Sequence, residues 1–330
     1  MVGVEPAAGT VGHPSAPLPM LRGSLAAVFH GPLGESGLRA FPLVLGAAEF
    51  GWTVDTATSH AILDAYRGLG GNIVHTSDSY AGGRSEHILG RWLARDGIRD
   101  SIVVAVRIGR HPDHPGLGSV NLVRAVEASL NRLDTDRIDL LYLDASGGLA
   151  SVEDALATAE WLVESGKVRA LGAYGFTAAQ LVDARILSSA GYPRVTVLDV
   201  PFNVVRRGDF TQDLRLVTGA QGIAVTPSHA LEHGFLAGGF TGAEVRSVRD
   251  AQRAASTSRR TVRAVRAMRQ VATAVAAPPA AVAIAWLLAQ RQVAAPIVNA
   301  YAVSHVEELV RGVGIRLTRA QLTEIARAYE

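Results

Sequence analysis

Apolar positions along the chain follow two alternating patterns from residue 41 onward. Short aliphatic and β-branched runs, typical of strands, alternate with longer stretches whose apolar residues recur at helical spacing. The predicted strands are residues 41–45, 71–75, 101–106, 138–143, 168–173, 194–198, 222–226 and 295–298. The predicted helices include residues 59–69, 85–95, 119–133, 152–165, 178–187 and 262–275, and Ser151 and Thr177 precede two of them as capping residues.

The predicted strands are apolar throughout, as expected when helices cover one side of a sheet and a packed interior lies on the other. Eight strand–helix units predict an α/β fold, a closed (β/α)8 TIM barrel. The alternative is an open doubly wound sheet, but no Gly-x-Gly-x-x-Gly sequence follows the first strand. We expect one barrel domain over residues 34–330, after a flexible N-terminal extension over residues 1–33.

Composition excludes several kinds of chemistry. The chain has 330 residues, a net charge of +2, 48% hydrophobic residues and no cysteine. Disulfides, thiolate catalysis and cysteine-ligated metals are therefore excluded. The single lysine, Lys167, precedes the fifth strand at the end of the barrel that serves stability, so a strand-end lysine cannot form a Schiff base.

The same composition narrows the partners. No apolar run reaches the roughly 18 residues that a membrane span needs, and the N-terminal residues do not read as a signal peptide. The low net charge and the lack of an aromatic-studded basic stripe argue against nucleic acid. We expect a cytoplasmic protein with a small-molecule substrate, no membrane or nucleic-acid partner, and an oligomeric state that the sequence leaves open.

Catalytic side chains of such a barrel lie at the C-terminal ends of the strands and in the loops that follow. The polar residues there are Glu49, His75, Asp78, Ser79, Tyr80, Arg107, Arg110, His111, Asp144, Ser146, Tyr174, Asp199, Asn203, Thr226, Ser228, His229, Asn299 and Tyr301. Some of them are N and O donors suited to Zn, Mn or Fe, but no pair has a compact ligand spacing. We therefore expect no metal.

Nine ordered motifs resemble those of the aldo-keto reductases. They are NIVHTSDSY (72–80), GGRSE (82–86), LGRWL (89–93), VEASL (126–130), LDTDRIDL (133–140), GKVRALG (166–172), PFN (201–203), AIAWLL (283–288) and PIV (296–298). The resemblance runs from about residue 33 to the C-terminus. It implies a (β/α)8 barrel and NADPH-dependent carbonyl reduction or alcohol oxidation, typically without a metal.

The resemblance also implies a catalytic tetrad of aspartate, tyrosine, lysine and histidine. In this chain the four positions hold His75, Tyr80, Arg107 and Asp144. Only the tyrosine, the general acid of the family, is kept, although an acid, an imidazole, a cation and a phenol are still present. We predict these four residues as the catalytic set, and we expect Asp78 of the same motif to structure its loop.

The positions that hold the cofactor in the family have changed as well. Tyr174, Gly175 and Asp199 stand where the family binds the nicotinamide carboxamide, and Val225 stands for the aromatic residue that stacks on the ring. Near the eighth strand, Asn299 and His305 replace the cations that grip the 2′-phosphate, and Leu309 replaces an asparagine that contacts adenine; Thr226 and Glu308 are kept. A 2′-phosphate requires cationic donors. Tight NADPH binding is therefore not expected; if NADPH binds, its predicted contacts are Tyr174, Asp199, Thr226, Asn299, His305 and Glu308.

The favoured prediction is a non-redox acid–base enzyme that needs no cofactor, of dehydratase, isomerase, epimerase or cyclase type, acting on a small metabolite in specialised metabolism. Arg107 would lower the pKa of the Tyr80 phenol, and Asp144 would orient His75 and favour its protonated form. The predicted substrate contacts are Glu49, Tyr174, Asp199, Asn203, His229 and Tyr301.

Two other functions stay open. The first is an NADPH-dependent carbonyl reductase or alcohol dehydrogenase with this unusual tetrad, which would hold its cofactor by backbone contacts and the arginine-rich residues 246–269. The second is a non-catalytic binding protein. Structural interpretations are open too: Arg107 and Asp144 as a salt bridge, Tyr174 as a plug, Asp199 as the partner of an arginine, and residues 246–269 as a solvated basic helix face.

Overall fold

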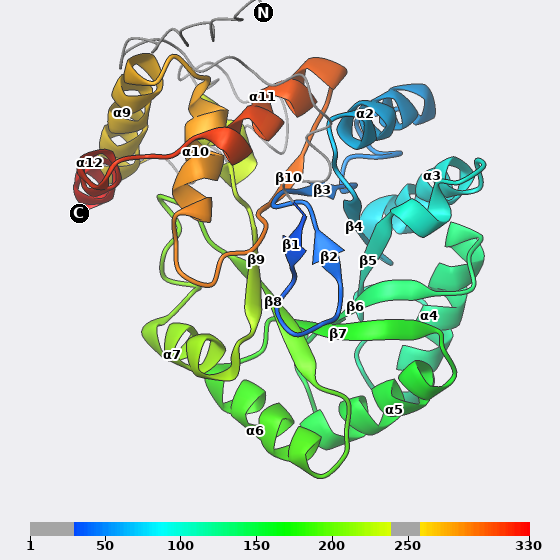
Figure 1. Cartoon of the computed structure of the whole chain (residues 1–330). Coiled ribbons are helices and arrows are strands. Elements are labelled where there is room, and N and C mark those ends of the chain that lie inside the picture. Colours follow the sequence, from blue (N-terminus) through cyan, green and yellow to red (C-terminus); the bar gives the residue numbers. More distant parts are fainter. Residues whose placement is uncertain (1–29, 239–257) are drawn as a thin grey trace, which may run out of the picture.

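The computed structural model describes residues 30–238 and 258–330, which form a barrel of eight parallel strands ringed by helices (Figure 1). The strands are β3 (Val44–Gly46), β4 (Ile73–Ser77), β5 (Val103–Ile108), β6 (Ile138–Asp144), β7 (Val168–Tyr174), β8 (Val195–Pro201), β9 (Ala224–Ser228) and β10 (Ile297–Asn299). Their spatial order is β10-β3-β4-β5-β6-β7-β8-β9. The sheet closes at Val225, whose N–H donates to Gln292 O (2.8 Å) and whose carbonyl accepts from Ala294 N (2.8 Å). The predicted (β/α)8 barrel is confirmed, and the open sheet is wrong.

Every predicted strand is present, and all eight extend further toward their C-terminal ends than predicted. Asp144 and Tyr174 are the last residues of β6 and β7, and they pair with each other in the parallel ladder. Asp199 lies within β8, opposite Tyr174 on β7. These polar residues belong to strands because backbone ladder bonds form whatever the side chain.

The outer layer consists of helices that follow the strands. They are α2 (Thr56–Gly68), α3 (Arg84–Leu93), α4 (Ser119–Leu133), α5 (Val152–Glu164), α6 (Ala178–Ser189), α7 (Gln212–Gln221), α9 (Arg259–Ala274), α10 (Pro279–Leu288), α11 (Val303–Gly314) and α12 (Arg319–Tyr329). The predicted caps are confirmed, since Ser151 and Thr177 accept hydrogen bonds from the N–H groups of Asp154 and Gln180. In the described part of the chain no single helix is long and apolar enough to cross a membrane; α9 and α10 meet the length and composition requirement only together, across a 98° bend.

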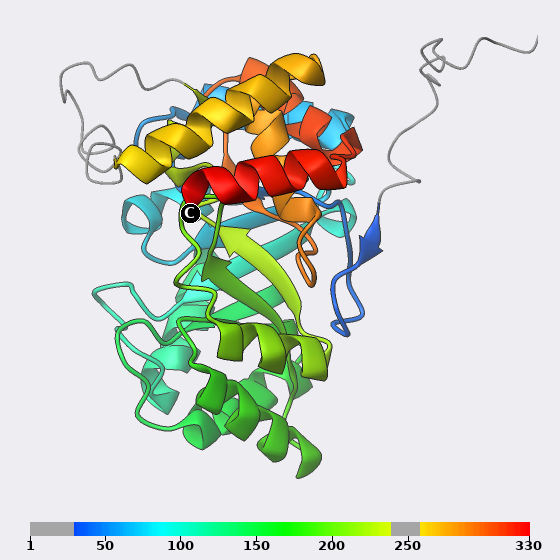
Figure 2. The same cartoon turned by 90° about the vertical axis from the view of Figure 1, so that its left-hand side faces the viewer.

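Alternation along each strand separates two apolar layers. On β9, Ala224 belongs to the cluster inside the barrel, whereas Val225 belongs to the cluster between barrel and helices. A hairpin of β1 (Gly31–Pro32) and β2 (Arg39–Ala40) closes the end opposite the strand C-termini, with Leu33 and Leu38 in the inner cluster (Figure 2). The last residues of the predicted N-terminal extension therefore form part of the barrel.

Candidate active site

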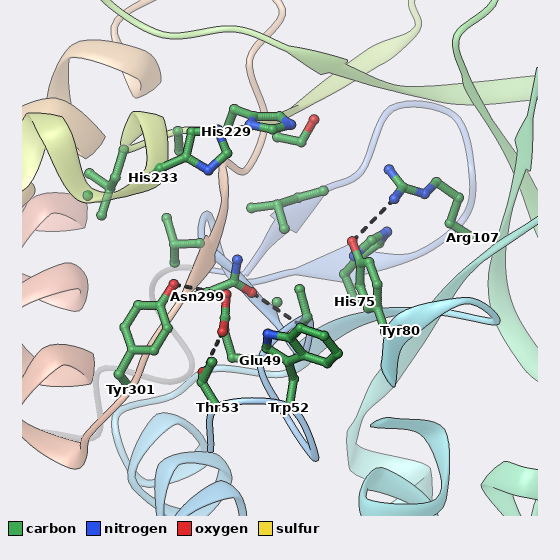
Figure 3. A pocket seen from close by; sticks show the side chains of 18 of the residues that line it. Glu49, Trp52, Thr53, His75, Tyr80, Arg107, His229, His233, Asn299 and Tyr301 are labelled. Atoms are coloured by element: carbon green, nitrogen blue, oxygen red, sulfur yellow. Dashed lines mark hydrogen bonds between the residues drawn. The ribbon is translucent and has the colours of Figure 1, made fainter. Parts of the chain in front are cut away.

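A cavity of about 610 Å³ opens at the C-terminal ends of the strands, where a barrel of this type carries its chemistry (Figure 3). It is lined by the loop after β3, the ends of β4, β5, β7 and β10, and the segment after β9. The lining includes Glu49, Trp52, Thr53, His75, Tyr80, Arg107, Tyr174, Ser228, His229, His233, Asn299 and Tyr301. Catalytic candidates from separate parts of the sequence thus share one space.

Tyr80 and Arg107 make the central contact of this cavity. Arg107 on β5 donates from Nη2 to the Tyr80 hydroxyl at 3.3 Å. On its other sides the guanidinium lies 3.4 Å from a carboxylate oxygen of Asp144 and 3.7 Å from one of Asp199. The cation is therefore held between a phenol and two buried carboxylates.

A left-handed turn presents Tyr80. Ala81, Gly82 and Gly83 have φ values of 52°, 63° and 84°, a conformation that the two glycines adopt without strain. The Asp78 carboxylate accepts hydrogen bonds from the N–H groups of Gly109 (3.0 Å) and His111 (3.3 Å), which ties this loop to the loop after β5. Asp78 therefore structures the loop, as predicted.

The predicted lowering of the Tyr80 pKa is wrong. Burial raises the pKa of the phenol above its usual 10; Arg107 opposes this, while Asp199 and Asp144 add to it. The sequence revealed the nearby cation, but the tertiary structure adds the desolvation and the second carboxylate. Tyr80 therefore keeps its proton at neutral pH and can act as a proton donor.

The predicted pair of His75 and Asp144 is also wrong. Among the described residues, neither buried ring nitrogen of His75 has a hydrogen-bond partner, and the ring packs edge-on against Tyr80 and Tyr142, with centroid distances of 6.1 and 5.6 Å. Asp144 instead contacts Arg107 and accepts hydrogen bonds from the N–H and hydroxyl of Ser146. Burial, with a contribution from Arg107, lowers the pKa of His75 to about 3, so the imidazole is neutral.

Asp199 is fully buried, and among the described residues neither of its carboxylate oxygens has a hydrogen bond of normal geometry, although Ser228 lies close enough to favour the charged form. Burial raises its pKa to about 6, although Arg107 acts in the opposite direction. The sequence left two roles open for this residue, ligand contact or arginine partner. The structure shows it beside Arg107.

Unsatisfied polar atoms concentrate around this centre. Among the described residues, eight buried side-chain N or O atoms have no hydrogen-bond partner, and six of them belong to His75, Arg107, Asp199 and Ser228. Buried polar groups are nearly always paired in folded proteins, so a local cluster of exceptions calls for water or a polar ligand. This is the strongest indication that the cavity is a functional site.

The ring of Tyr174 packs on the guanidinium of Arg107. Its ring centroid lies 4.3 Å from the Arg107 guanidinium carbon, a cation–π contact, and burial raises the pKa of its hydroxyl. The side chain is half-buried and lines the cavity. It therefore packs on Arg107 and still offers a surface to a ligand.

Three more predicted substrate contacts line the cavity: Glu49, His229 and Tyr301. Glu49 accepts hydrogen bonds from the Tyr301 hydroxyl (3.1 Å) and the Thr53 hydroxyl (2.5 Å), which joins the loops after β3 and β10. Burial and nearby Arg206 lower the pKa of His229 to about 4.

Asn203 is fully buried, and its amide forms hydrogen bonds with the segment after β9 that forms one wall of the cavity. Its Nδ2 donates to His229 O (2.8 Å) and to the carboxylate of Glu232 (2.7 Å), which also binds Arg206 through two hydrogen bonds. His229, Glu232 and His233 all have positive φ, at 56°, 43° and 54°. The cluster of Asn203 and Glu232, which are buried, and Arg206, which is partly exposed, holds this strained segment in place.

The predicted cofactor positions divide into two groups. Asn299 lines the cavity, where its side-chain oxygen accepts a hydrogen bond from Ala48 N (3.4 Å). The second group, Thr226, His305 and Glu308, does not line the cavity. Thr226 is buried and hydrogen-bonded to the Tyr142 hydroxyl (2.8 Å), and His305 Nδ1 accepts a hydrogen bond from Tyr301 N (3.3 Å). Glu308 is exposed on α11.

Val225 does not occupy the ring-stacking position that the sequence assigned to it. Its side chain faces the helices, and the β9 residue that lines the cavity is Ser228. Strand alternation places residues three positions apart on opposite faces of the sheet, so Val225 cannot face the cavity while Ser228 lines it.

Sequence reasoning missed Tyr142, Trp52, Thr53 and His233. Tyr142 points into the barrel two residues before Asp144, a position that strand alternation could have revealed. The other three line the cavity from loops that carry no periodic signal.

The metal prediction and the arginine-rich segment can be placed only in part. Among the described residues, no three His, Asp or Glu side chains form a group that could hold a metal ion.

Of the arginine-rich segment, residues 246–257 lie outside the described residues. On α9 the five arginines are exposed, while Met268 and Val271 are buried; this is the predicted basic helix face, except that Val262 is also exposed.

Comparisons with known proteins agree with this architecture. The sequence profile of the aldo/keto reductase family matches residues 42–330. The chain is 28% identical to norsolorinic acid reductase of Aspergillus flavus over 90% of this chain and 80% of that protein. It is 29% identical to aldo-keto reductase ausK of Aspergillus calidoustus (87% and 78%) and 26% identical to a putative aryl-alcohol dehydrogenase of Saccharomyces cerevisiae (87% and 82%). With a barrel of this topology and a match over nearly its whole length, the chain belongs to the aldo/keto reductase family.

Proposed function

We propose that the protein reduces a carbonyl group of a small organic molecule, with a nicotinamide dinucleotide as the hydride donor. The observation that carries the proposal is the hydrogen bond of 3.3 Å from Arg107 to the hydroxyl of a protonated Tyr80 at the cavity floor. Family membership and relatives named as reductases support it. A bound reduced nicotinamide would supply the hydride to the carbonyl carbon.

Tyr80 supplies the proton. Its raised pKa keeps the phenol protonated at neutral pH, and the Arg107 N–H stabilises the phenolate that remains when the proton moves to the carbonyl oxygen. Asp144 and Asp199 hold the guanidinium in this position. Arginine thus takes the role of the lysine of the family, with a fixed geometry and a permanent charge.

His75 orients the carbonyl. A neutral imidazole has one N–H, and both ring nitrogens of His75, beside Tyr80, lack hydrogen-bond partners within residues 30–238 and 258–330. A carbonyl oxygen within reach of the Tyr80 hydroxyl would accept that N–H as a second hydrogen bond. The residue therefore acts as a neutral donor and not as the protonated acid that the sequence suggested.

The fit of the carboxamide position to a nicotinamide is partial. A carboxamide has two N–H donors and one acceptor oxygen, and Ser228 on the cavity wall offers it a hydroxyl. Asp199 is fully buried beside Arg107 and does not line the cavity, so its carboxylate is not a contact in this conformation. The phosphate positions differ, because Asn299 and His305 provide no permanent cation. We therefore propose a dinucleotide without selectivity for the 2′-phosphate.

The non-redox interpretation has lost the two features that favoured it. The pKa of Tyr80 is raised and not lowered, and Asp144 contacts Arg107 and not a protonated His75. Turnover of a substrate without any dinucleotide would restore it.

The test is oxidation of NADH and NADPH by the purified protein with a panel of aldehydes and ketones. We expect turnover that falls roughly a hundredfold or more in Tyr80→Phe. The matched control is Tyr192→Phe, since Tyr192 lies outside the cavity and its hydroxyl donates to Glu153. Absence of dinucleotide binding by calorimetry, or full activity in Tyr80→Phe, would refute the proposal.

A further inference from the structure

Two histidines lie next to each other where the segment after β9 lines the cavity. His233, which sequence reasoning missed, follows His229 by four residues, and both side chains line the cavity. Their ring centroids are 5.1 Å apart, and the ring planes meet at 73°. Figure 3 shows this pair on the other side of the cavity from Trp52 and apart from Tyr80 and Arg107. The two imidazoles therefore form a group of ring nitrogens that is separate from the proposed catalytic centre.

The backbone of this segment is strained, and the strain is concentrated at the histidines. Among the described residues, seven that are not glycine have a positive φ, and three of the seven are His229, Glu232 and His233. Such conformations cost free energy in residues that carry a side chain, and they are often found at functional sites. Asn203 donates a hydrogen bond to the carbonyl of His229, and the Glu232 carboxylate accepts from Asn203 and Arg206. The fold thus maintains an unfavourable backbone conformation that presents both imidazoles to the cavity.

The distance between the two rings fits a single metal ion bound to both. Zinc binds imidazole nitrogen at about 2.1 Å, and a tetrahedral ion bound to one nitrogen of each ring would place the ring centroids roughly 5 Å apart. The observed distance of 5.1 Å agrees with this arrangement. An imidazole that binds a metal through one nitrogen usually donates a hydrogen bond from the other, so contacts between these rings and the protein are compatible with metal binding.

We propose that His229 and His233 together bind one divalent transition-metal ion of the Zn²⁺ or Ni²⁺ type at the edge of the cavity. Imidazole nitrogen suits these ions, whereas Mg²⁺ and Ca²⁺ require oxygen ligands. Among the described residues no group of three His, Asp or Glu side chains could hold a metal, so the site has two protein ligands and open coordination positions. Water, or a polar group of a molecule in the cavity, completes the coordination.

Calorimetric titration of the purified full-length chain, without a histidine tag, with NiCl₂ tests the site. We expect one tightly bound ion per chain, and an affinity that falls about tenfold or more in His229→Gln and in His233→Gln. The matched control is His111→Gln/His114→Gln, which removes two histidines three positions apart from the loop after β5 and should leave the affinity unchanged. Equal affinity in the wild type and in His229→Gln/His233→Gln would refute the proposal.

Pulsed electron paramagnetic resonance with Cu²⁺ counts the bound imidazoles in the wild-type protein, so this measurement does not depend on the folding of a variant. At one Cu²⁺ per chain we expect the echo modulation of two imidazoles. Each single variant that retains the circular dichroism spectrum of the wild type should show the modulation of one. A wild-type spectrum with one imidazole or none, or two imidazoles in a single variant, would overturn the assignment.

The metal site does not depend on the proposed reductase activity. Both measurements use neither substrate nor dinucleotide. Failure of Ni²⁺ and Cu²⁺ to bind at His229 and His233 therefore leaves the reductase proposal intact, and absence of dinucleotide binding leaves the metal site intact.

Discussion

Replacement of His75 by phenylalanine is expected to make the protein less sensitive to acid. The imidazole is buried between Tyr80 and Tyr142, and its pKa falls from 6.5 to about 3 on folding. Between these two values the unfolded chain binds a proton at this residue and the folded chain does not. The contribution of His75 to stability is therefore present above pH 6.5 and is lost as the pH falls toward 3.

The size of the effect follows from the pKa difference. At about pH 4 the unfolded imidazole lies roughly 2.5 pH units below its pKa and is protonated, whereas the folded imidazole is mostly neutral. At about 1.36 kcal/mol per pH unit, protonation stabilises the unfolded state by about 3 kcal/mol. Phenylalanine keeps a ring between Tyr80 and Tyr142 but does not titrate. The loss of stability between about pH 8 and pH 4 should therefore be smaller by about 3 kcal/mol in His75→Phe.

Urea unfolding followed by circular dichroism, at a series of pH values between about 4 and 8, measures this difference. Only the pH dependence is compared, so a constant loss from imperfect packing of the larger ring does not affect the result. The exposed His87 on α3 provides the control variant, His87→Gln. Equal pH dependence in wild type and His75→Phe would refute the assignment of a buried, neutral imidazole.

Three further predictions test the surroundings of the cavity. The pKa of Asp199 is raised from 3.8 to about 6, so its contribution to stability is present below pH 3.8 and is lost as the pH rises through 6. Between about pH 4 and pH 8 the free energy of unfolding of Asp199→Asn should therefore rise by about 3 kcal/mol relative to that of the wild type in urea unfolding, and an unchanged pH dependence would contradict this. With Asn299 and His305 at the phosphate positions, kcat/KM for NADH and NADPH should agree within about tenfold; a strong preference for NADPH would show a cation at another position. Glu232→Ala should lower the free energy of unfolding by about 2 kcal/mol, since Arg206 and Asn203 lose their buried acceptor, and unchanged stability would show that the cluster does not hold this wall.

The barrel itself could be predicted from the sequence. Repeated apolar runs and amphipathic stretches specify strand and helix directly, because side-chain period is a local property of the backbone. The capping residues Ser151 and Thr177 could be assigned for the same reason, as their bonds reach neighbouring backbone groups. The role of Asp78 came instead from the family motif, since its bond reaches Gly109 at the next strand end. The gathering of Tyr80 and Arg107 followed from barrel topology, since parallel strand ends meet at one face.

The partners within that face were decided by the tertiary structure alone. Because β5 lies between β4 and β6, the long side chain of Arg107 lies between His75 and Asp144 and forms an ion pair with the Asp144 carboxylate. A permanent cation is the stronger partner for a buried carboxylate, so the imidazole is left neutral. Burial likewise reversed the direction expected for the Tyr80 pKa, because desolvation depends on neighbours that are distant in sequence.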